Sequence, residues 1–125
     1  MEGEKRVRLL IIDDSPTIRQ TLARLGVFVP RVEVVGEAAN GIEGLKLIRK
    51  LRPDVITLDI QMPEMGGIEV LKTIKAEGLD CAVIILSAMP ERTYREQCLA
   101  LEADYVFDKT SELKKVIEAL LALSR

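Results

Sequence analysis

Five short apolar runs recur along this chain, and their spacing constrains its fold more than any other feature of the sequence. The runs are Val7–Ile12, Val32–Val35, Val55–Leu58, Ala82–Leu86 and Tyr105–Phe107, and most of their residues are β-branched or aromatic. Four of the five are nearly continuous in apolar residues, which is typical of strands that are covered on both faces of a parallel sheet. The sequence therefore predicts five buried parallel strands.

Segments with apolar residues at helical spacing follow each of these runs. Four of them carry apolar stripes: Ile18, Leu22 and Leu25; Ile42, Leu45, Ile48 and Leu51; Ile68, Leu71 and Ile74; and Leu113, Val116, Ile117 and Leu120. The fourth segment along the chain, residues 91–102, is polar apart from Tyr94, Cys98, Leu99 and Leu101. The residues expected to bound them are Ser15 as N-cap with Pro16 after it, Pro53, Gly78, Pro90, and Thr110 or Ser111 as the last N-cap. Each stripe is spaced as one face of an α-helix, and with the polar segment this predicts five helices.

Strands that alternate with helices in this way predict an α/β protein with an open five-stranded parallel sheet and helices on both faces. The 125 residues, 48% of them apolar, suit one domain over residues 1–125. Because the last helix is predicted to run almost to Arg125, we expect no separate output domain.

Charge and residue counts exclude several classes of function. The 18 basic and 20 acidic residues give a net charge of -2, so no basic field is available for nucleic acid or for an anionic membrane. Histidine is absent, which excludes His-dependent triads, imidazole zinc sites and a histidine phosphocarrier. The charged N-terminus is no signal peptide, and no apolar run is long enough to span a membrane. We expect a cytoplasmic protein, with Cys81 and Cys98 as reduced thiols.

Charged and hydroxyl side chains stand where the predicted strands end. These strand ends carry Asp13 and Asp14, Gly36, Asp59, Ser87, and Asp108 with Lys109. In open α/β sheets, ligands bind beyond the carboxyl ends of the strands, so these groups are expected to converge. Two carboxylates about 4 Å apart repel by roughly 4 kcal/mol at an effective dielectric near 20, so the cluster needs protons, a cation or both. Oxygen ligands at an open edge favour Mg²⁺, and a carboxylate there can act as a nucleophile toward phosphorus.

The residues at these strand ends resemble the receiver domain of two-component response regulators, in particular the single-domain chemotaxis regulators. The resemblance covers Val7 to Leu123. Its motifs are Ile11-Ile12-Asp13-Asp14-Ser15, the run DVITLDIQMPEMGG from Asp54 to Gly67, Leu86-Ser87-Ala88, and Ala103-Asp104 through Lys109. The resemblance implies a flavodoxin-like sheet with the strand order 2-1-3-4-5.

The resemblance also implies a role for each site residue. Asp59 would be the phosphate acceptor, with Ser87 and Lys109 holding the phosphoryl group. The Mg²⁺ ligands would be Asp13, Asp14, Asp59 and the backbone carbonyl of Gln61. Phosphate would come from a sensor histidine kinase, a phosphotransfer protein or a small acyl phosphate. The domain would catalyse only its own phosphorylation and dephosphorylation, without turning over a separate substrate.

Four positions depart from the family pattern. Gly66 replaces the Asp or Asn often found in the turn after Asp59, a turn in which Pro63 fixes φ and the glycines permit positive φ. Thr110 replaces a Pro after Lys109, so that peptide bond is expected to be trans. Val106 occupies the usual switch-aromatic position, with Tyr105 and Phe107 on the opposite face of the strand. Met89 is expected to hinder water and prolong the phosphoryl lifetime, so that Met89→Glu would shorten it.

Phosphorylation is expected to move the surface built from residues 91–102, Tyr105 and residues 112–123, which would bind an unidentified downstream protein or form a homodimer. Four alternatives stay open: a receiver-like binding module that needs no phosphate, the excised N-terminal domain of a larger regulator, an Asp-nucleophile phosphatase, and a flavodoxin-like binder of a phosphate cofactor. Gln61 speaks against the phosphatase because it cannot serve as a general acid. Asp13 and Asp14 likewise speak against a flavodoxin-like cofactor site, since without a metal they repel phosphate.

Overall fold

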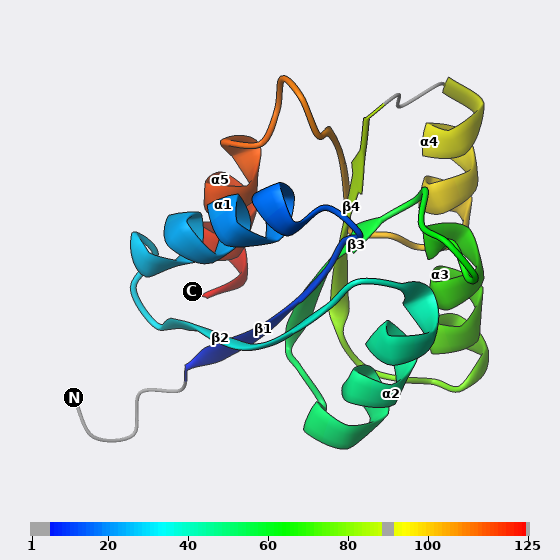
Figure 1. The fold of residues 1–125 in the computed structure, drawn as a ribbon, viewed down its shortest axis with the longest axis horizontal. Coiled ribbons are helices and arrows are strands. Elements are labelled where there is room, and N and C mark those ends of the chain that lie inside the picture. The colour runs from blue at the N-terminus through cyan, green and yellow to red at the C-terminus, as the bar shows by residue number, and fades with distance from the viewer. Residues whose placement is uncertain (1–5, 89–91, 125) are drawn as a thin grey trace.

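The computed structural model describes residues 6–88 and 92–124, and Figure 1 shows its strands and helices in strict alternation. The elements are β1 (Val7–Ile12), α1 (Pro16–Val27), β2 (Val32–Ala38), α2 (Gly41–Leu51), β3 (Val55–Asp59), α3 (Gly67–Ala76), β4 (Ala82–Ser87), α4 (Arg92–Ala100), β5 (Tyr105–Asp108) and α5 (Lys115–Leu123). All four strand pairings are parallel, and the order is β2-β1-β3-β4-β5. The predicted fold and strand order are confirmed.

The sheet separates two hydrophobic cores, one on each face (Figure 1). Helices α2, α3 and α4 cover one face, where Leu45, Ile74 and Cys98 are buried. Helices α1 and α5 cover the other, where Leu22 and Leu120 are buried. Successive residues of each strand point to opposite faces, so the continuous apolar runs supply both cores at once.

Local sequence signals fix several helix ends, and those at Ser15 and Gly78 were predicted. The Ser15 side chain accepts a hydrogen bond from the backbone N–H of Ile18, with Pro16 at the first helical position. Asn40 caps α2 in the same way, by accepting from the N–H of Glu43. Gly78, just past the end of α3, has φ of 64°.

Three predicted details are wrong. Strand β2 continues past Gly36 to Ala38, because after a register shift Ile11 and Ile12 of β1 pair with Glu37 and Ala38. Helix α5 starts at Lys115, and neither Thr110 nor Ser111 caps it: their backbone N–H groups donate to the Asp108 carboxylate and close a turn instead. Ile42 in the first turn of α2 is 39% exposed and lies outside the core.

The glycines after Asp59 serve close packing instead of positive φ. Gly66 has φ of -78°, and the left-handed residue of this turn is Glu64, with φ of 68°. A Cβ on Gly67 would overlap the backbone oxygen of Asp59, so only glycine fits there. The Gly66 position caps α3 without a side-chain hydrogen bond, as expected from the missing Asp or Asn.

Strand β5 divides its side chains between the two cores as predicted. Val106 is buried in the core under α4, whereas Tyr105 and Phe107 pack on the side of α1 and α5, with ring centroids 5.6 Å apart. The bond between Lys109 and Thr110 is trans, since the described residues include no cis peptide. Both cysteines are free thiols.

No helix in the described part of the chain is long and apolar enough to cross a membrane. The expectations for Met89, and for Pro90 and Glu91 at the start of the fourth helical segment, lie outside the described residues.

One buried hydroxyl is expected to reduce stability. Thr57 in the middle of β3 is 1% exposed, and its Oγ1 has no hydrogen-bond partner among the described residues. An unpaired buried polar group costs about 1–3 kcal/mol, so Thr57→Val is expected to raise the free energy of unfolding by about 1 kcal/mol in urea titrations. Thr57→Ser, which keeps the hydroxyl and deletes a methyl group, is expected to lower it by about 1 kcal/mol. A loss of stability in Thr57→Val would contradict the assignment of an unpaired hydroxyl.

Candidate functional site

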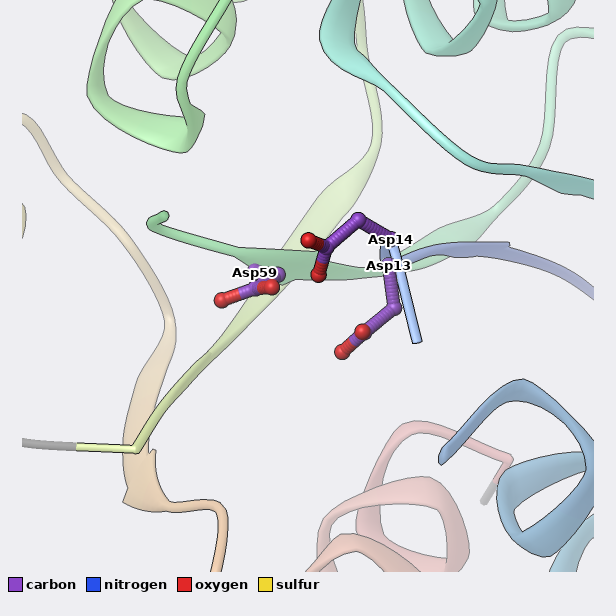
Figure 2. A group of neighbouring side chains, drawn as sticks. All are labelled: Asp13, Asp14 and Asp59. Atoms are coloured by element: carbon purple, nitrogen blue, oxygen red, sulfur yellow. The ribbon is translucent and has the colours of Figure 1, made fainter. Parts of the chain in front are cut away.

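Three carboxylates meet at the carboxyl edge of the sheet (Figure 2). Asp13 and Asp14 directly follow β1, and Asp59 is the last residue of the adjacent strand β3. One oxygen from each lies within 4.8 Å of the others. Asp13 and Asp59 are only 1% and 3% exposed, whereas Asp14 is open to solvent. The edge position that the sequence predicts for these residues is therefore what the fold produces.

Lys109 contacts both buried carboxylates from the end of β5, which is separated from β3 by β4 in the sheet. It follows β5, yet its ammonium lies 3.0 Å from Asp59 Oδ2 and 2.9–3.0 Å from the two oxygens of Asp13. The Lys109 side chain is 11% exposed, so water screens these ion pairs only weakly. Its backbone N–H donates to the carbonyl of Ser87, which ties the start of this loop to β4.

Backbone donors orient both buried carboxylates. The N–H of Ser15 donates to Asp13 Oδ1 at 2.8 Å, and the N–H of Gln61 donates to Asp59 Oδ1 at 3.2 Å. Each contact spans two residues, as in an Asx turn, and turns the side chain back over the end of its own strand. The carboxylates are therefore held in place before any ligand binds.

Sequence reasoning missed Arg19 as a support of this edge. From the first turns of α1 its guanidinium donates to the backbone carbonyl of Asp13 at 2.6 Å and pairs with Glu37 of β2 at 3.3 Å. The sequence offers one weak signal for this role. Arg19 lies one helical turn after the N-cap Ser15, which places its side chain on the side of α1 that faces the strand ends. Its contacts join β1, α1 and β2 beside the cluster.

The electrostatics of the cluster are unbalanced without a cation. Burial and the charge of Asp13 raise the pKa of Asp59 to about 6, although Lys109 acts against this rise. For Lys109, burial lowers the pKa, but hydrogen bonds and charge attraction from Asp13 and Asp59 outweigh burial and raise it. The two buried carboxylates thus share the Lys109 ammonium, and the carboxylate of Asp14 lies beside them.

The remaining predicted residues are placed as follows. Ser87 ends β4, next to β3 in the sheet, and is 2% exposed. Gln61 is exposed in the loop after β3, and its N–H contacts Asp59. Asp108 does not join the cluster, because its carboxylate accepts from Thr110 and Ser111.

The residues present fit a hard divalent cation. The ligand set is all oxygen and carries two buried carboxylates and an exposed one, which is the donor chemistry that Mg²⁺ prefers. In addition, Asp13 Oδ2 is buried, and among the described residues its contact with the Lys109 ammonium at 2.9 Å is an ion pair without the geometry of a hydrogen bond. A buried carboxylate oxygen that already lies against a cation and has spare lone pairs is suited to bind a metal ion.

Comparison with known proteins identifies the family. The family model of the response regulator receiver domain matches residues 9–121. The chain belongs to the response regulator receiver domain family.

Relatives of this receiver domain occur in longer regulators. A protein-glutamate methylesterase/protein-glutamine glutaminase of Clostridium acetobutylicum is 34% identical over 122 residues, which are 94% of this chain and 35% of that protein. The response regulator domain of CheB from Thermotoga maritima is 32% identical with a TM-score of 0.84, covering 97% of this chain and 95% of that one. CheY in the CheX-CheY-BeF3-Mg complex from Borrelia burgdorferi matches at 26% identity and a TM-score of 0.86, covering 95% and 90% of the two chains. The receiver spans 24% to 35% of the length of the methylesterase relatives with which it aligns.

The charge imbalance predicts a pH-dependent stability. The pKa of Asp59 lies at about 6 in the folded protein against an ordinary value of 3.8, so the folded state binds more protons between these values. The contribution of Asp59 to the free energy of unfolding in EDTA is therefore expected to fall by about 2 kcal/mol as the pH rises from 4 to 6, and it is read as the difference between the wild type and a variant without this carboxyl. Asp59→Asn removes the buried charge and is expected to be more stable than the wild type by about 2 kcal/mol at pH 7, and by much less at pH 4.

Asp14→Asn is the matched control, because Asp14 is exposed and its neutralisation is expected to change stability by less than about 0.5 kcal/mol. Denaturant titrations at several pH values measure all three proteins. A stability advantage of Asp59→Asn over the wild type that does not grow between pH 4 and 6 would contradict the raised pKa.

Proposed function

We propose that this receiver domain is a phosphorylation switch of the cytoplasm, in which Asp59 accepts a phosphoryl group in a Mg²⁺-dependent reaction. The donor is a phosphohistidine of a sensor kinase or phosphotransfer protein, or a small acyl phosphate. The observation that carries the proposal is the position of Asp59: its carboxylate lies at the sheet edge, 3.0 Å from the Lys109 ammonium and beside Asp13 and Asp14.

The residues of the cluster divide the reaction between them. An Asp59 oxygen attacks phosphorus, the bond from phosphorus to the donor nitrogen breaks, and its electron pair leaves with the imidazole. Lys109 exchanges part of its contact with Asp59 for the oxygens of the phosphoryl group. The hydroxyl of Ser87, at the end of the neighbouring strand, donates to another of these oxygens. Asp13, Asp14, Asp59 and the Gln61 carbonyl would hold Mg²⁺, which would supply positive charge to offset the added negative charge.

The protonation state of Asp59 suits this role. Its pKa of about 6 leaves the carboxylate mostly ionised near pH 7, so a nucleophile is available, and a bound cation would counteract the rise in this pKa. Asp13 lies beside it as a second buried carboxyl group. The product is a covalent form of the domain itself, so no separate substrate is turned over.

Phosphorylation changes the charge at Asp59 from -1 to about -1.5 to -2. The new phosphoryl oxygens accept hydrogen bonds from Ser87 at the end of β4 and from Lys109 after β5. We propose that the surface of α4, β5 and α5 responds to this change and binds a downstream protein or a second copy of the chain. A bias of a few kcal/mol on a two-state element is enough to invert its populations.

A second candidate function is that of a regulatory part within a longer protein of the methylesterase type. It is favoured by the number of protein-glutamate methylesterases among the relatives, each several times longer than this chain. The mass of the endogenous protein tests it: a species well above 13.9 kDa that contains these residues would support the longer regulator.

Phosphorylation is tested by incubating the purified protein with Mg²⁺ and acetyl phosphate and taking its intact mass. The wild type is expected to gain one phosphoryl group, and neither Asp59→Asn nor the wild type in EDTA is expected to gain any. A wild type that gains nothing under these conditions or from a histidine kinase would contradict the proposal and favour a binding module that needs no phosphate.

The two supporting residues are tested by the rate of that mass change. Removing a group that contacts developing charge costs roughly tenfold to a thousandfold, so we expect Lys109→Met to slow the reaction about a hundredfold and Ser87→Ala about tenfold. Lys72→Met, which removes an exposed lysine from α3, is the control and is expected to react at the wild-type rate. An unchanged rate in Lys109→Met would remove Lys109 from the mechanism.

A further inference from the structure

Glu112, in the segment between β5 and α5, holds the loop that carries Lys109. Its Oε1 accepts the backbone N–H of Asp108 at 2.9 Å, and its own backbone N–H donates to the Asp108 carbonyl at 2.8 Å. Asp108 directly precedes Lys109, so these two hydrogen bonds fix the peptide from which the Lys109 side chain reaches Asp13 and Asp59.

The carboxylate of Glu112 is ionised and partly buried. The Lys115 ammonium donates to Oε2 at 2.6 Å, and this bond together with the Asp108 N–H lowers the pKa of Glu112. The side chain is 24% exposed. Glu112 therefore brings a fixed negative charge to the end of β5.

Arg95 of α4 contacts the same place from the other side. Its guanidinium donates to the backbone carbonyl of Val106 in β5 at 3.2 Å and lies 3.8 Å from Glu112 Oε1. Arg95 thus joins α4 both to β5 and to the residue that holds the Lys109 loop. Arg92, one turn earlier, instead pairs with Glu96 on the exposed side of the same helix.

Side-chain packing offers little alternative to this polar connection. On the α4 side β5 presents Val106, a small buried residue, while Tyr105 and Phe107 face α1 and α5. The short, branched side chain of Val106 cannot swing between a position near α4 and a position near the site, as a longer side chain could. The contacts that span from α4 to the Lys109 loop in the described residues are those of Arg95.

We propose that Glu112 is a positioning residue for Lys109, and that the Arg95–Glu112 pair transmits displacements of Lys109 to α4. The proposal rests on the phosphorylation switch proposed above, because it is the phosphoryl group that would displace Lys109. When Lys109 moves toward a new anion, the Asp108 peptide moves with it, Glu112 follows through its hydrogen bond, and Arg95 loses or exchanges a partner. Helix α4 is thereby released from β5.

Two substitutions at position 112 separate the hydrogen bond of this side chain to Asp108 from its ion pairs. Glu112→Gln keeps an oxygen that accepts the Asp108 N–H but loses the ion pairs with Arg95 and Lys115. Glu112→Ala loses all three contacts. We therefore expect Glu112→Gln to be phosphorylated by acetyl phosphate within about twofold of the wild-type rate, and Glu112→Ala to be at least fivefold slower.

Coupling to α4 is measured by hydrogen exchange of a peptide that covers residues 92–100, in protein without phosphate. Lys109→Met releases the loop from Asp13 and Asp59, and we expect it to raise the exchange rate of this peptide at least threefold. In a Glu112→Gln or Arg95→Gln background the same substitution is expected to add less than 1.5-fold. Arg92→Gln is the matched control on the same helix, and in its background the threefold increase is expected to persist.

An equal increase in all backgrounds would overturn the proposal, as would its disappearance in Arg92→Gln, which would indicate a general loosening of α4. The same peptide is then followed after addition of beryllofluoride and Mg²⁺. The wild type and Arg92→Gln are expected to respond and Glu112→Gln is not; a Glu112→Gln protein that responds like the wild type would also overturn the proposal. If the wild type itself neither responds nor becomes phosphorylated, the proposed function fails, while the Lys109→Met comparison still decides the coupling.

Discussion

The buried ammonium of Lys109 is the interaction on which the rest of this site depends. Two carboxylates with almost no solvent exposure, Asp13 and Asp59, end neighbouring strands and would repel each other strongly without a shared cation. Lys109 reaches both from a third strand, and it does so from a loop that is bonded to β4. Any group that competes for this ammonium therefore acts on β1, β3, β4 and β5 together.

Close backbone packing makes that convergence possible. Asp59 can sit at the end of β3 because the chain after it doubles back so tightly that Gly67, the first residue of α3, touches the Asp59 carbonyl. Gly41 at the start of α2 is packed as closely against the carbonyl of Met65 in the same turn. These contacts hold the turn close to the sheet edge. The carboxylate of Asp59 is therefore kept in the cluster with Asp13 and Asp14.

Periodicity predicted what depends on burial, and it failed where a polar side chain decides the local structure. The five runs gave the strands and both cores, and parallel pairing then placed Asp13, Asp59 and Lys109 together. The last residues of β2 were not predicted because Glu37 interrupts the apolar run. Its backbone nevertheless pairs with β1, and β2 lies at the edge of the sheet, where a polar side chain is tolerated. The Asp108 carboxylate accepts hydrogen bonds from the N–H groups of Thr110 and Ser111, so these residues form a turn and α5 begins only at Lys115. Arg19 and Glu112 were missed because their roles depend on partners distant in space or bound through the backbone.

The same reasoning indicates why a polar connection suits this chain where β5 carries valine. An apolar side chain in a close-packed core fits in a single position. Val106 can therefore transmit a displacement only by pushing against the residues packed around it. An arginine that shares its donors between a carbonyl and a carboxylate has two partners to choose from, and small shifts of the loop change which one it holds. Partial solvent exposure keeps each contact weak enough to exchange. A switch built in this way is governed by charge at the site, and the proposed phosphorylation of Asp59 would change that charge.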